Sequence, residues 1–445
     1  MFPVYEISLW VVIICLLATI FWQRCGRKIR RYLENRKKKA KRPFSLRPKK
    51  PEDCPCCVAG VSLKEVNPKP KQSVPPWSER KMSGGPQKRV DTNGYACPHI
   101  QCDYFLERDS RIHALEDCGV RGRTARIQWF KCQACQTRFS SRLDTVLQHL
   151  KTDPERIELV LNLLAEGVDP TAIIRVCGHC EETIDHWLSR AGHHATLLHD
   201  DYFRDLQLDY LQLDELYANI RQEEGKSWLW AVIDPVTKII PSIYIGGRKT
   251  TDAMIFIHDL TLRLAPGYIP LMITDGLRQY FWALTAHFGI WVKRFPWRKH
   301  RWLVDPKLLY AQLVKVRYGR KLKQTITRVL CGDAASIRQK LIDLGFTGTI
   351  GTPFIERWNL TFRMMISALT RRTWSQSQKK EKLKIHVEWG RAYYHFVRIH
   401  HGLTLARSVP KEYRFRTPAM AAGLTGHRWS TLEILRLPLR PAHPA

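Results

Sequence analysis

The sequence predicts a multidomain protein in which an α/β core follows two small domains. Three observations lead to this fold class: two spaced cysteine pairs, a stretch of helical periodicity, and a longer region in which strand-like runs precede alternating helices and strands. The 445 residues suffice for roughly two to four domains. A hydrophobic content of 44% is ordinary for a globular chain and argues against wholesale disorder.

The first predicted segment, residues 1–33, is an apolar run with a basic flank. Residues 7–22 are uncharged and apolar, and basic residues follow at once, namely Arg24, Arg27, Lys28, Arg30 and Arg31. The run falls just short of the roughly 17–25 residues of a membrane span. A secretory signal would carry positive charge before the apolar run, where Glu6 stands instead. The segment is interpreted as a short anchor that keeps the remaining chain cytoplasmic, as a packed or amphipathic helix, or as an extension from an upstream start codon.

Residues 34–90 are predicted to form a basic, proline-rich linker, because lysine runs and prolines replace apolar periodicity. Within it, Cys54 and Cys57 form a Cys-x2-Cys pair that has no evident second half in the sequence. The favoured interpretation gives this pair no role, and the alternative is a metal site shared with a partner chain.

Residues 91–150 are predicted to form a zinc ribbon. Cys97 and Cys102 pair with Cys132 and Cys135 at a spacing that closes a tetrahedral four-thiolate Zn²⁺ site. Three further residues between the pairs could replace a ligand, namely His99, His113 and Cys118. The 13 cysteines are odd in number and clustered, which indicates a reducing compartment with metal sites and not a disulfide scaffold.

Residues 151–200 are predicted to form a helix-turn-helix domain. Pro154 suits a first helical position, Asp169-Pro170 begins a second helix, and Cys177-Gly178 turns the chain into a third helix over 181–191. The polar residues of this last helix are Glu182, Thr183, Asp185, His186, Ser189 and Arg190. Thr183, His186 and Arg190 are the candidates for DNA contact. The alternative is a structural three-helix unit. Cys177 and Cys180 are expected to be packing residues of these helices.

Residues 205–400 are predicted to form the α/β core. The expected strands cover 206–218, 228–234, 239–245, 269–274 and 290–292, and the expected helices cover 250–264 and 277–287. Three successive strands, then alternating helices and strands, form the order of the ribonuclease-H-like topology. Its first strand lies centrally and its fourth strand lies beside the first, so Asp214 and Asp275 are expected to be neighbours.

Three carboxylates, Asp214, Asp275 and Glu356, are the candidate catalytic and metal-binding residues. Carboxylates with open positions suit two Mg²⁺ or Mn²⁺ ions, which can drive in-line attack on a phosphodiester. Glu215 follows Asp214 directly, so its side chain should point to the opposite face, and it is not expected to be a ligand. The sequence shows no competing Ser/His/Asp arrangement, Walker loop or dinucleotide glycine pattern.

Glu356 begins a helix-like stretch with one polar and one apolar stripe. Glu356, Asn359 and Arg363 fall at i, i+3 and i+7, and the apolar stripe comprises Trp358, Phe362, Met365 and Leu369. The polar stripe would turn Glu356 towards the other two acids. DNA-binding residues are expected to include Asn359, Arg363, Arg371 and Arg372.

The charge balance indicates a polyanionic partner. Lys and Arg number 72 against 41 acidic residues, a formal net charge of +31, and neutralised phosphates release counterions. Acidic membranes and a basic surface kept for solubility are the alternatives. A basic insertion is expected at about 291–350, and its segment 293–323 is lysine- and arginine-rich with interleaved aromatics. It is interpreted as contacting DNA or another protomer, or as an ordinary basic surface.

These residues together resemble insertion-sequence transposases of the DDE type, over roughly residues 91–425. The resemblance rests on Asp214-Glu-Leu-Tyr, Trp228-Leu-Trp with Asp234, Thr274-Asp-Gly, Ile355-Glu-Arg-Trp-Asn-Leu-Thr-Phe-Arg363, Leu369-Thr-Arg-Arg-Thr-Trp374, the Tyr394–Leu403 region and Thr417-Pro-Ala-Met-Ala-Ala-Gly-Leu. It implies an enzyme that binds the terminal inverted repeats of its element, nicks the DNA and joins the freed 3′ ends to a target. Asp214, Asp275 and Glu356 would then be the metal-binding triad, and the four ribbon cysteines the zinc ligands.

The implied partner is double-stranded DNA, and joining two ends implies a homodimer or a larger assembly. The implied location is the cytoplasm, at the nucleoid or tethered to the inner face of the membrane by residues 7–22. Residues 401–445 are expected to form a C-terminal tail. Two alternatives remain, a catalytically idle DNA-binding protein derived from a transposase and a stand-alone nuclease with the same core.

Overall fold

The computed structural model describes residues 47–66, 74–80, 90–122, 126–221, 226–293, 300–319, 321–370 and 377–440. Within them the fold is mixed α/β, and the described residues from Pro48 onward belong to one compact unit. The apolar run 7–22 and the predicted DNA-contacting residues Arg371 and Arg372 lie outside the described residues. Across the described ranges, every helix is too short or too polar to cross a membrane.

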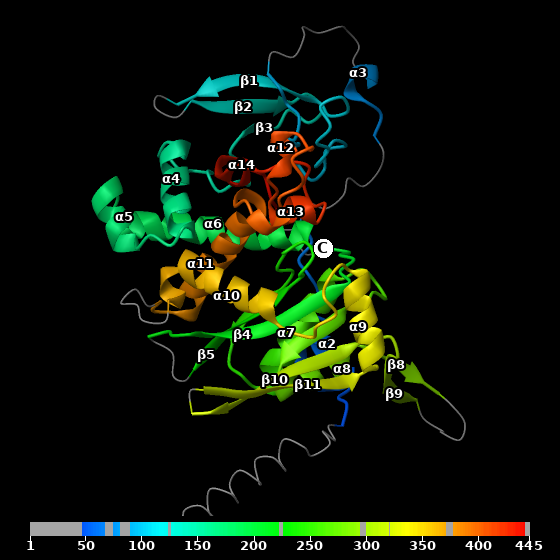
Figure 1. Cartoon of the computed structure of the whole chain (residues 1–445). Coiled ribbons are helices and arrows are strands. Elements are labelled where there is room, and N and C mark those ends of the chain that lie inside the picture. The colour runs from blue at the N-terminus through cyan, green and yellow to red at the C-terminus, as the bar shows by residue number, and fades with distance from the viewer. Residues whose placement is uncertain are drawn as a thin grey trace, which may run out of the picture. The chain divides into compact units, whose positions relative to one another are not determined.

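The main sheet has six strands in the order β11-β10-β7-β4-β5-β6, of which β4, β5, β10 and β11 are labelled in Figure 1. The strands are β4 (Tyr210–Ala218), β5 (Ser227–Ile233), β6 (Ile243–Gly246), β7 (Leu271–Asp275), β10 (Tyr310–Tyr318) and β11 (Lys321–Cys331). β4 pairs antiparallel with β5 and parallel with β7, and β7 pairs parallel with β10. The prediction that the strands of Asp214 and Asp275 lie side by side is therefore confirmed.

Helices cover both faces of this sheet, which explains why β4 is nearly continuous in buried residues. The helices α7 (Thr250–Arg263) and α8 (Arg278–His287) lie on one face, where Tyr280 packs edge-on against Trp230 of β5 at 5.3 Å between ring centroids. The helix α10 (Pro353–Met365) lies on the other face, where the backbone N–H of Phe354 donates to the side chain of Gln212.

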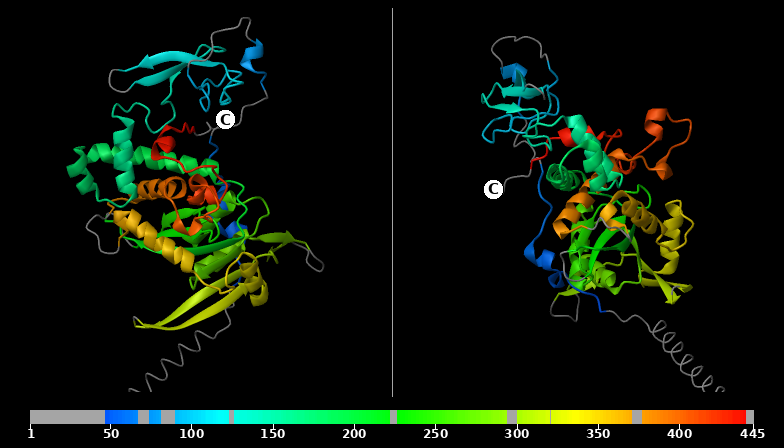
Figure 2. Two further views of the ribbon diagram at one scale, coloured as in Figure 1. Left: turned by 45° about the horizontal axis from the view of Figure 1, so that its top comes forward. Right: turned by 90° about the vertical axis from the view of Figure 1, so that its left-hand side faces the viewer.

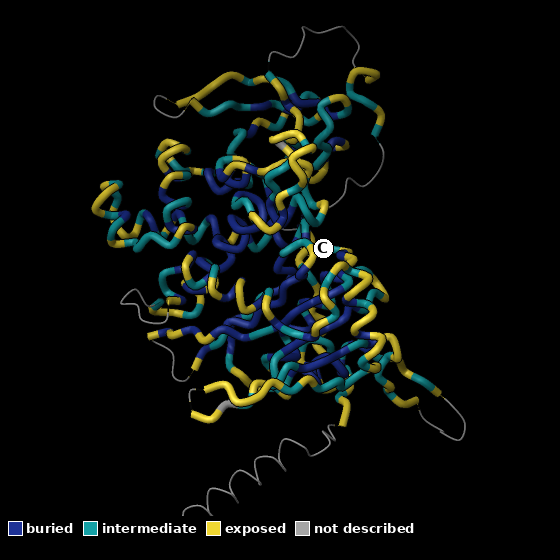
Figure 3. The backbone as a smooth tube through the Cα atoms, in the orientation of Figure 1, coloured by how far each residue is buried: buried dark blue, intermediate teal, exposed yellow. Residues whose placement is uncertain are grey.

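The basic region expected as an insertion carries part of the main sheet instead. The strand β8 (Gly289–Val292) pairs with β9 (Arg301–Val304) in a separate two-stranded sheet, while β10 and β11 extend the main sheet and α9 (Ala334–Asp343) follows them. The surrounding lysines and arginines obscured the alternation of β10 in the sequence. The start of β10 is fully buried, whereas most residues at the start of β11 are exposed (Figure 3).

The three predicted helices before the core are present as α4 (Pro154–Ala165), α5 (Pro170–Cys177) and α6 (Glu181–Tyr202). Asp169 caps α5 by accepting the N–H of Thr171, and Gly178 ends α5 in the left-handed conformation, with φ of 69°. Helix α6 continues beyond its predicted end, because its buried face packs along α11 (Lys380–Ala392).

The ribbon region forms a three-stranded antiparallel sheet of β1 (Leu115–Arg121), β2 (Ile127–Cys132) and β3 (Arg138–Ser140). Its small core joins buried aromatic side chains to the cysteines, and Phe130 contacts Phe139 at 5.8 Å between ring centroids.

Two parts of the predicted linker 34–90 are ordered. The segment 48–66, blue in Figure 2, contains η1 (Pro51–Asp53) and α2 (Pro55–Ala59) and lies against α7 and α8. The helix α3 (Trp77–Arg80) packs on the ribbon, where Trp77 meets Tyr104 edge-on at 5.8 Å between ring centroids. A few buried anchors, Cys54 among them, order these segments despite their charged composition.

The C-terminal region is also packed, although the sequence suggested a tail. The predicted tail contains η4 (His401–Leu403), α12 (Lys411–Arg414), α13 (Pro418–Ala421) and α14 (Thr431–Arg436), and it follows η2 (Ser367–Leu369) and η3 (Tyr393–Val397). Trp429 stacks on Phe396 with ring centroids 4.6 Å apart, and Arg440 Nε donates to the carboxylate of Asp144 at 2.9 Å.

Candidate active site

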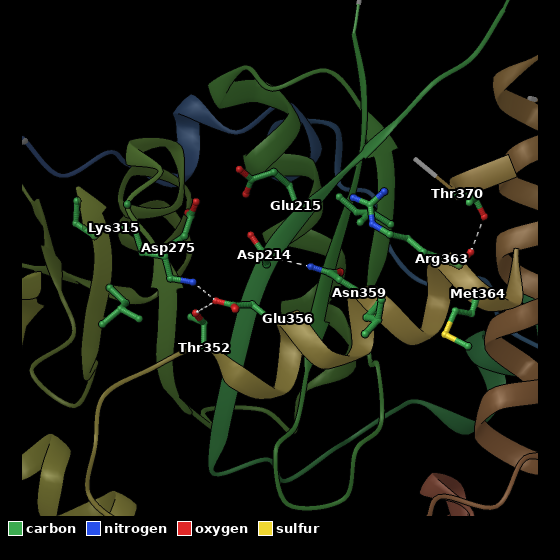
Figure 4. Close-up of a pocket in the computed structure, with 15 residues that line it drawn as sticks. Asp214, Glu215, Asp275, Lys315, Thr352, Glu356, Asn359, Arg363, Met364 and Thr370 are labelled. Carbon is green, nitrogen blue, oxygen red and sulfur yellow. Dashed lines mark hydrogen bonds and ion pairs between the residues drawn. The ribbon is translucent and has the colours of Figure 1, made fainter. Parts of the chain in front are cut away.

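The three predicted acids line one open cavity of about 1000 Å³ (Figure 4). Asp214 comes from the middle of β4, Asp275 from the end of β7, and Glu356 from the first turn of α10. The three acids are far apart in sequence. The parallel pairing of β4 with β7 and the packing of α10 on β4 bring them to the same cavity. The cavity is therefore built by the sheet and one helix together.

The tightest acidic group in the cavity is Asp214, Glu215 and Asp275, whose carboxylate oxygens lie within 4.8 Å of one another. Glu215 was not expected here because alternation along the strand points it away from Asp214, but its carboxyl group still reaches this cluster. Both of its oxygens are engaged, since Oε1 forms an ion pair with Arg248 and Oε2 accepts the hydroxyl of Tyr280 at 3.2 Å. Residues on the face of the main sheet opposite to α10 thus hold the carboxyl group of Glu215.

Burial and mutual repulsion disfavour negative charge at these carboxyl groups. Burial, together with the neighbouring Asp275, raises the pKa of Asp214 to about 7. The same two causes raise the pKa of Glu215 to about 8, and burial raises the pKa of Asp275. Three crowded carboxyls of this kind suit a site that receives divalent cations, because a cation would favour their ionised forms.

Asn359 adds an amide oxygen to the carboxyl oxygens of the cavity, and this oxygen also suits a cation. Its Nδ2 donates to Asp214 Oδ2 at 2.8 Å, whereas its buried Oδ1 has no hydrogen-bond partner. A buried amide oxygen without a donor is uncommon in a folded protein, and here it lies on the wall of the acidic cavity. The residues present therefore fit hard, oxygen-preferring cations such as Mg²⁺ or Mn²⁺.

Glu356 lies in the cavity wall but outside the compact acidic group. Its Oε1 accepts the hydroxyl of Thr352 at 2.9 Å and forms an ion pair with Lys315 of β10. The predicted stripes of α10 are confirmed, because Glu356, Asn359 and Arg363 all line the cavity while the apolar stripe is buried.

Gln212 fixes the helix that carries Glu356, although nothing in the sequence singled it out as a site residue. Its Oε1 accepts the backbone N–H groups of Phe354 at 2.9 Å and Ile355 at 3.1 Å, and its Nε2 donates to the carbonyl of Gly351 at 3.0 Å. Gln212 therefore satisfies free donors in the first turn of α10. A polar residue two positions before Asp214, on the same face of a buried strand, was the available signal.

The predicted DNA-contacting residues fall into different environments. Asn359 is buried beside Asp214 and lines the cavity. Arg363 lines the cavity and donates to the carbonyl of Leu369 at 3.0 Å.

In the helix α6, His186 is exposed and Thr183 is half-buried, with its Oγ1 3.0 Å from Cys180 Sγ. Arg190 differs from the expectation, because its guanidinium donates to the carbonyls of Val146 at 2.8 Å and Thr145 at 3.3 Å. Through these two hydrogen bonds, Arg190 connects α6 to the end of the ribbon region.

The ribbon cysteines converge as a second candidate metal centre. All four sulfurs lie within 4.8 Å of one another, with 3.4 Å between Cys97 and Cys135 and 3.8 Å between Cys102 and Cys132. All are free thiols, and four sulfur donors fit a tetrahedral Zn²⁺ site. His113 is occupied by backbone hydrogen bonds to Thr92 and Leu115, so it is not needed as a ligand.

Comparison with known proteins gives no match, either among protein-family models or among curated proteins.

Proposed function

We propose that the chain is a DDE-type transposase, which cleaves DNA at the ends of its element and joins those ends to a target in a metal-dependent reaction. One observation carries this proposal: Asp214, Asp275 and Glu356, from two adjacent strands and a helix, line a single open cavity. Acids arranged around an accessible cavity suit phosphodiester chemistry better than a purely structural role.

The strand arrangement supports a ribonuclease-H-like core. The order β6-β5-β4-β7-β10, with β4, β5 and β6 antiparallel and β7 and β10 parallel to β4, is the order expected for that topology. On this interpretation β10 supplies the fifth strand, and Asp214 stands on the central strand.

Asp214, Asp275 and Glu356 would hold two Mg²⁺ or Mn²⁺ ions, which when bound would activate water or a DNA 3′-hydroxyl and stabilise the leaving oxygen. Asn359 orients the carboxylate of Asp214 through its Nδ2. Glu215 stays outside this set, because Arg248 and Tyr280 already occupy its two oxygens. Lys315 would move from Glu356 to a DNA phosphate when Glu356 takes a cation.

The surface around the cavity supports a DNA substrate. Lys315 and Arg363 lie in the cavity wall, and Lys321 and Lys323 are exposed on the adjoining β10–β11 hairpin. Together with the overall charge of +31, these cations would attract the phosphate backbone. The zinc ribbon and the three-helix unit would contribute further DNA contacts, through the exposed His186 among others, and joining two ends would require at least a dimer.

The test uses the full chain and DNA fragments from both sides of its own gene, with scrambled fragments as the control. The wild-type protein should nick the flanking fragments in Mg²⁺ and join their 3′ ends to a second DNA. Asp214→Asn should bind these fragments with unchanged affinity but cleave them at least ~100-fold more slowly. Asp343→Asn, an exposed change on α9, should retain full activity.

Two outcomes would replace the proposal by its alternatives. Binding of the flanking fragments without any cleavage in Mg²⁺ or Mn²⁺ would indicate an idle DNA-binding protein. Cleavage without strand joining would indicate a stand-alone nuclease.

A further inference from the structure

Four potential soft-metal ligands from three distant segments converge at the edge of the core. Cys54 and Cys57 belong to the segment 48–66, His258 to α7, and His287 to the end of α8. Their ligand atoms all lie within 4.8 Å of one another. Cys57 Sγ is 3.3 Å from His258 Nδ1 and 3.4 Å from His287 Nε2. The Cys-x2-Cys pair has no evident second half in the sequence, but the fold places His258 and His287 beside it.

Local structure brings the two cysteines to one side. Cys54 precedes α2 and Cys57 lies one turn later within it, and Gly60 then ends this turn in the left-handed conformation with φ of 63°. Cys54 is fully buried, and its sulfur approaches the carbonyl of Met254, one turn before His258 on α7. Cys56 lies between the two cysteines in sequence but outside the four-residue group.

Both histidines are held with one ring nitrogen open to the cysteines. His258 Nε2 lies 2.7 Å from the carbonyl of Val61, and His287 Nδ1 lies 2.7 Å from the carbonyl of Ala283. Because a carbonyl only accepts, each of these nitrogens must carry the proton. The other nitrogen of each ring, His258 Nδ1 and His287 Nε2, is then a free lone pair directed at Cys57. Metal-binding histidines typically have this backbone support.

We propose that Cys54, Cys57, His258 and His287 form a structural Zn²⁺ site, separate from the ribbon and from the acidic cavity. Two thiolates and two imidazoles form a closed, borderline-soft donor set, which favours zinc over Mg²⁺ or Mn²⁺. Four protein ligands leave no open position, so the site is structural and does not activate water.

The site would fasten the segment 48–61 to the helices that flank β7. It joins ligands far apart in sequence, as the separation of 201 between Cys57 and His258 shows. Its ligands on α7 and α8 stand on the elements directly before and after β7, the strand that ends in Asp275. Zinc at this site would therefore restrain α7 and α8, the helix pair that covers one face of the main sheet, and would stabilise the fold by joining distant segments.

The direct experiment is the zinc content of the full-length protein, measured by mass spectrometry after purification without added metal. The wild-type chain should contain about two Zn²⁺ ions, one for each four-ligand set. Cys57→Ser and His287→Asn should each lose one, and Cys132→Ser should lose the other, belonging to the ribbon. Cys56→Ser is the matched control and should retain both.

A wild-type chain with a single Zn²⁺ that disappears in Cys132→Ser would overturn the proposal, as would full zinc content in Cys57→Ser. A wild-type chain with clearly fewer than two Zn²⁺ ions would already contradict the pair of predicted sites, so the proposal stays testable even where a variant fails to fold. Cobalt replacement in Cys132→Ser, whose ribbon is disabled, gives a second readout. A tetrahedral two-thiolate spectrum is expected there, and its absence in the folded variant would contradict the site. Neither measurement depends on DNA cleavage, so this proposal and the proposed function can fail separately.

Discussion

Burial and the neighbouring carboxyl groups of Asp275 and Glu356 disfavour negative charge at Asp214. Its pKa is raised to about 7, chiefly by burial and then by Asp275, against an ordinary value of 3.8. The folded state therefore binds more protons than the unfolded chain between about pH 4 and pH 7. The stability that this protonation provides is fully present below about pH 4 and is lost as the pH rises through about 7.

This pKa shift predicts how stability responds to pH at Asp214. In Mg²⁺-free buffer, the free energy of unfolding of the wild type should fall between about pH 5 and pH 8, and Asp214→Asn should reduce that fall by on the order of 1–3 kcal/mol. Urea unfolding of both proteins at the two pH values measures the difference. An equal fall in wild type and Asp214→Asn would contradict the electrostatic explanation, and Asp343→Asn should behave as the wild type.

Gln212 offers a second test at the scale of one residue. Gln212→Leu would leave the N–H groups of Phe354 and Ile355 without their acceptor inside the protein. Unfolding in urea should show a loss of about 2–4 kcal/mol, because buried unsatisfied donors are costly. Gln339→Leu removes an exposed hydrogen bond to Asp343 on α9 and should change stability by less than about 0.5 kcal/mol. Similar values for the two variants would show that Gln212 does not hold α10.

At the scale of elements, the helices α6 and α11 pack closely at Gly192. A Cβ atom at this position would lie 2.4 Å from the backbone oxygen of Ile385. Gly192→Ala should therefore destabilise the protein by about 2 kcal/mol or more, since the backbone of α11 must move. Gly426→Ala, where a Cβ meets nothing within 4 Å, is the matched control. Thermal unfolding that does not separate the two variants would disprove this close approach.

Arg190 tests the connection between α6 and the ribbon region. Because its guanidinium donates to the carbonyls of Thr145 and Val146, Arg190→Ala should lower the free energy of unfolding by about 1–3 kcal/mol. Fluorescence anisotropy with duplex DNA should meanwhile show little change in affinity. A large loss of affinity at unchanged stability would restore Arg190 to the DNA-contacting role that the sequence suggested.

Periodicity and capping residues were sufficient to predict most elements between residues 154 and 292. Asp169-Pro170 and Gly178 marked the ends of α5, and the apolar alternation of 206–218 marked β4, because these signals are local. The strand β10 was not predicted, since flanking lysines and arginines hid its short apolar alternation. The segment 48–66 was taken for linker because the groups that order it, on α7 and α8, are remote in sequence.

At the scale of the whole molecule, the sequence located the three acids around the cavity but not their partners. Strand order brought Asp214 beside Asp275, and the polar stripe of α10 turned Glu356 into the same cavity. Glu215 belongs to the compact acidic group because its side chain is long enough to reach Asp214 and Asp275. The alternation of side chains along β4 does not describe this reach. The engagement of Glu356 by Lys315 depends on β10, the strand that the sequence did not reveal.

Our central proposal is that Asp214, Asp275 and Glu356 act together on DNA, and that Glu215 only supports them. The decisive experiment compares the single-turnover rates of Mg²⁺-dependent cleavage of the flanking DNA by Glu356→Gln and Glu215→Gln. Glu356→Gln should cleave at least ~100-fold more slowly than the wild type. Glu215→Gln should stay within about tenfold, because Arg248 and Tyr280 already engage both oxygens of Glu215 and leave it outside the set of proposed metal ligands. Cleavage by Glu356→Gln at the wild-type rate would contradict the assignment of these three acids.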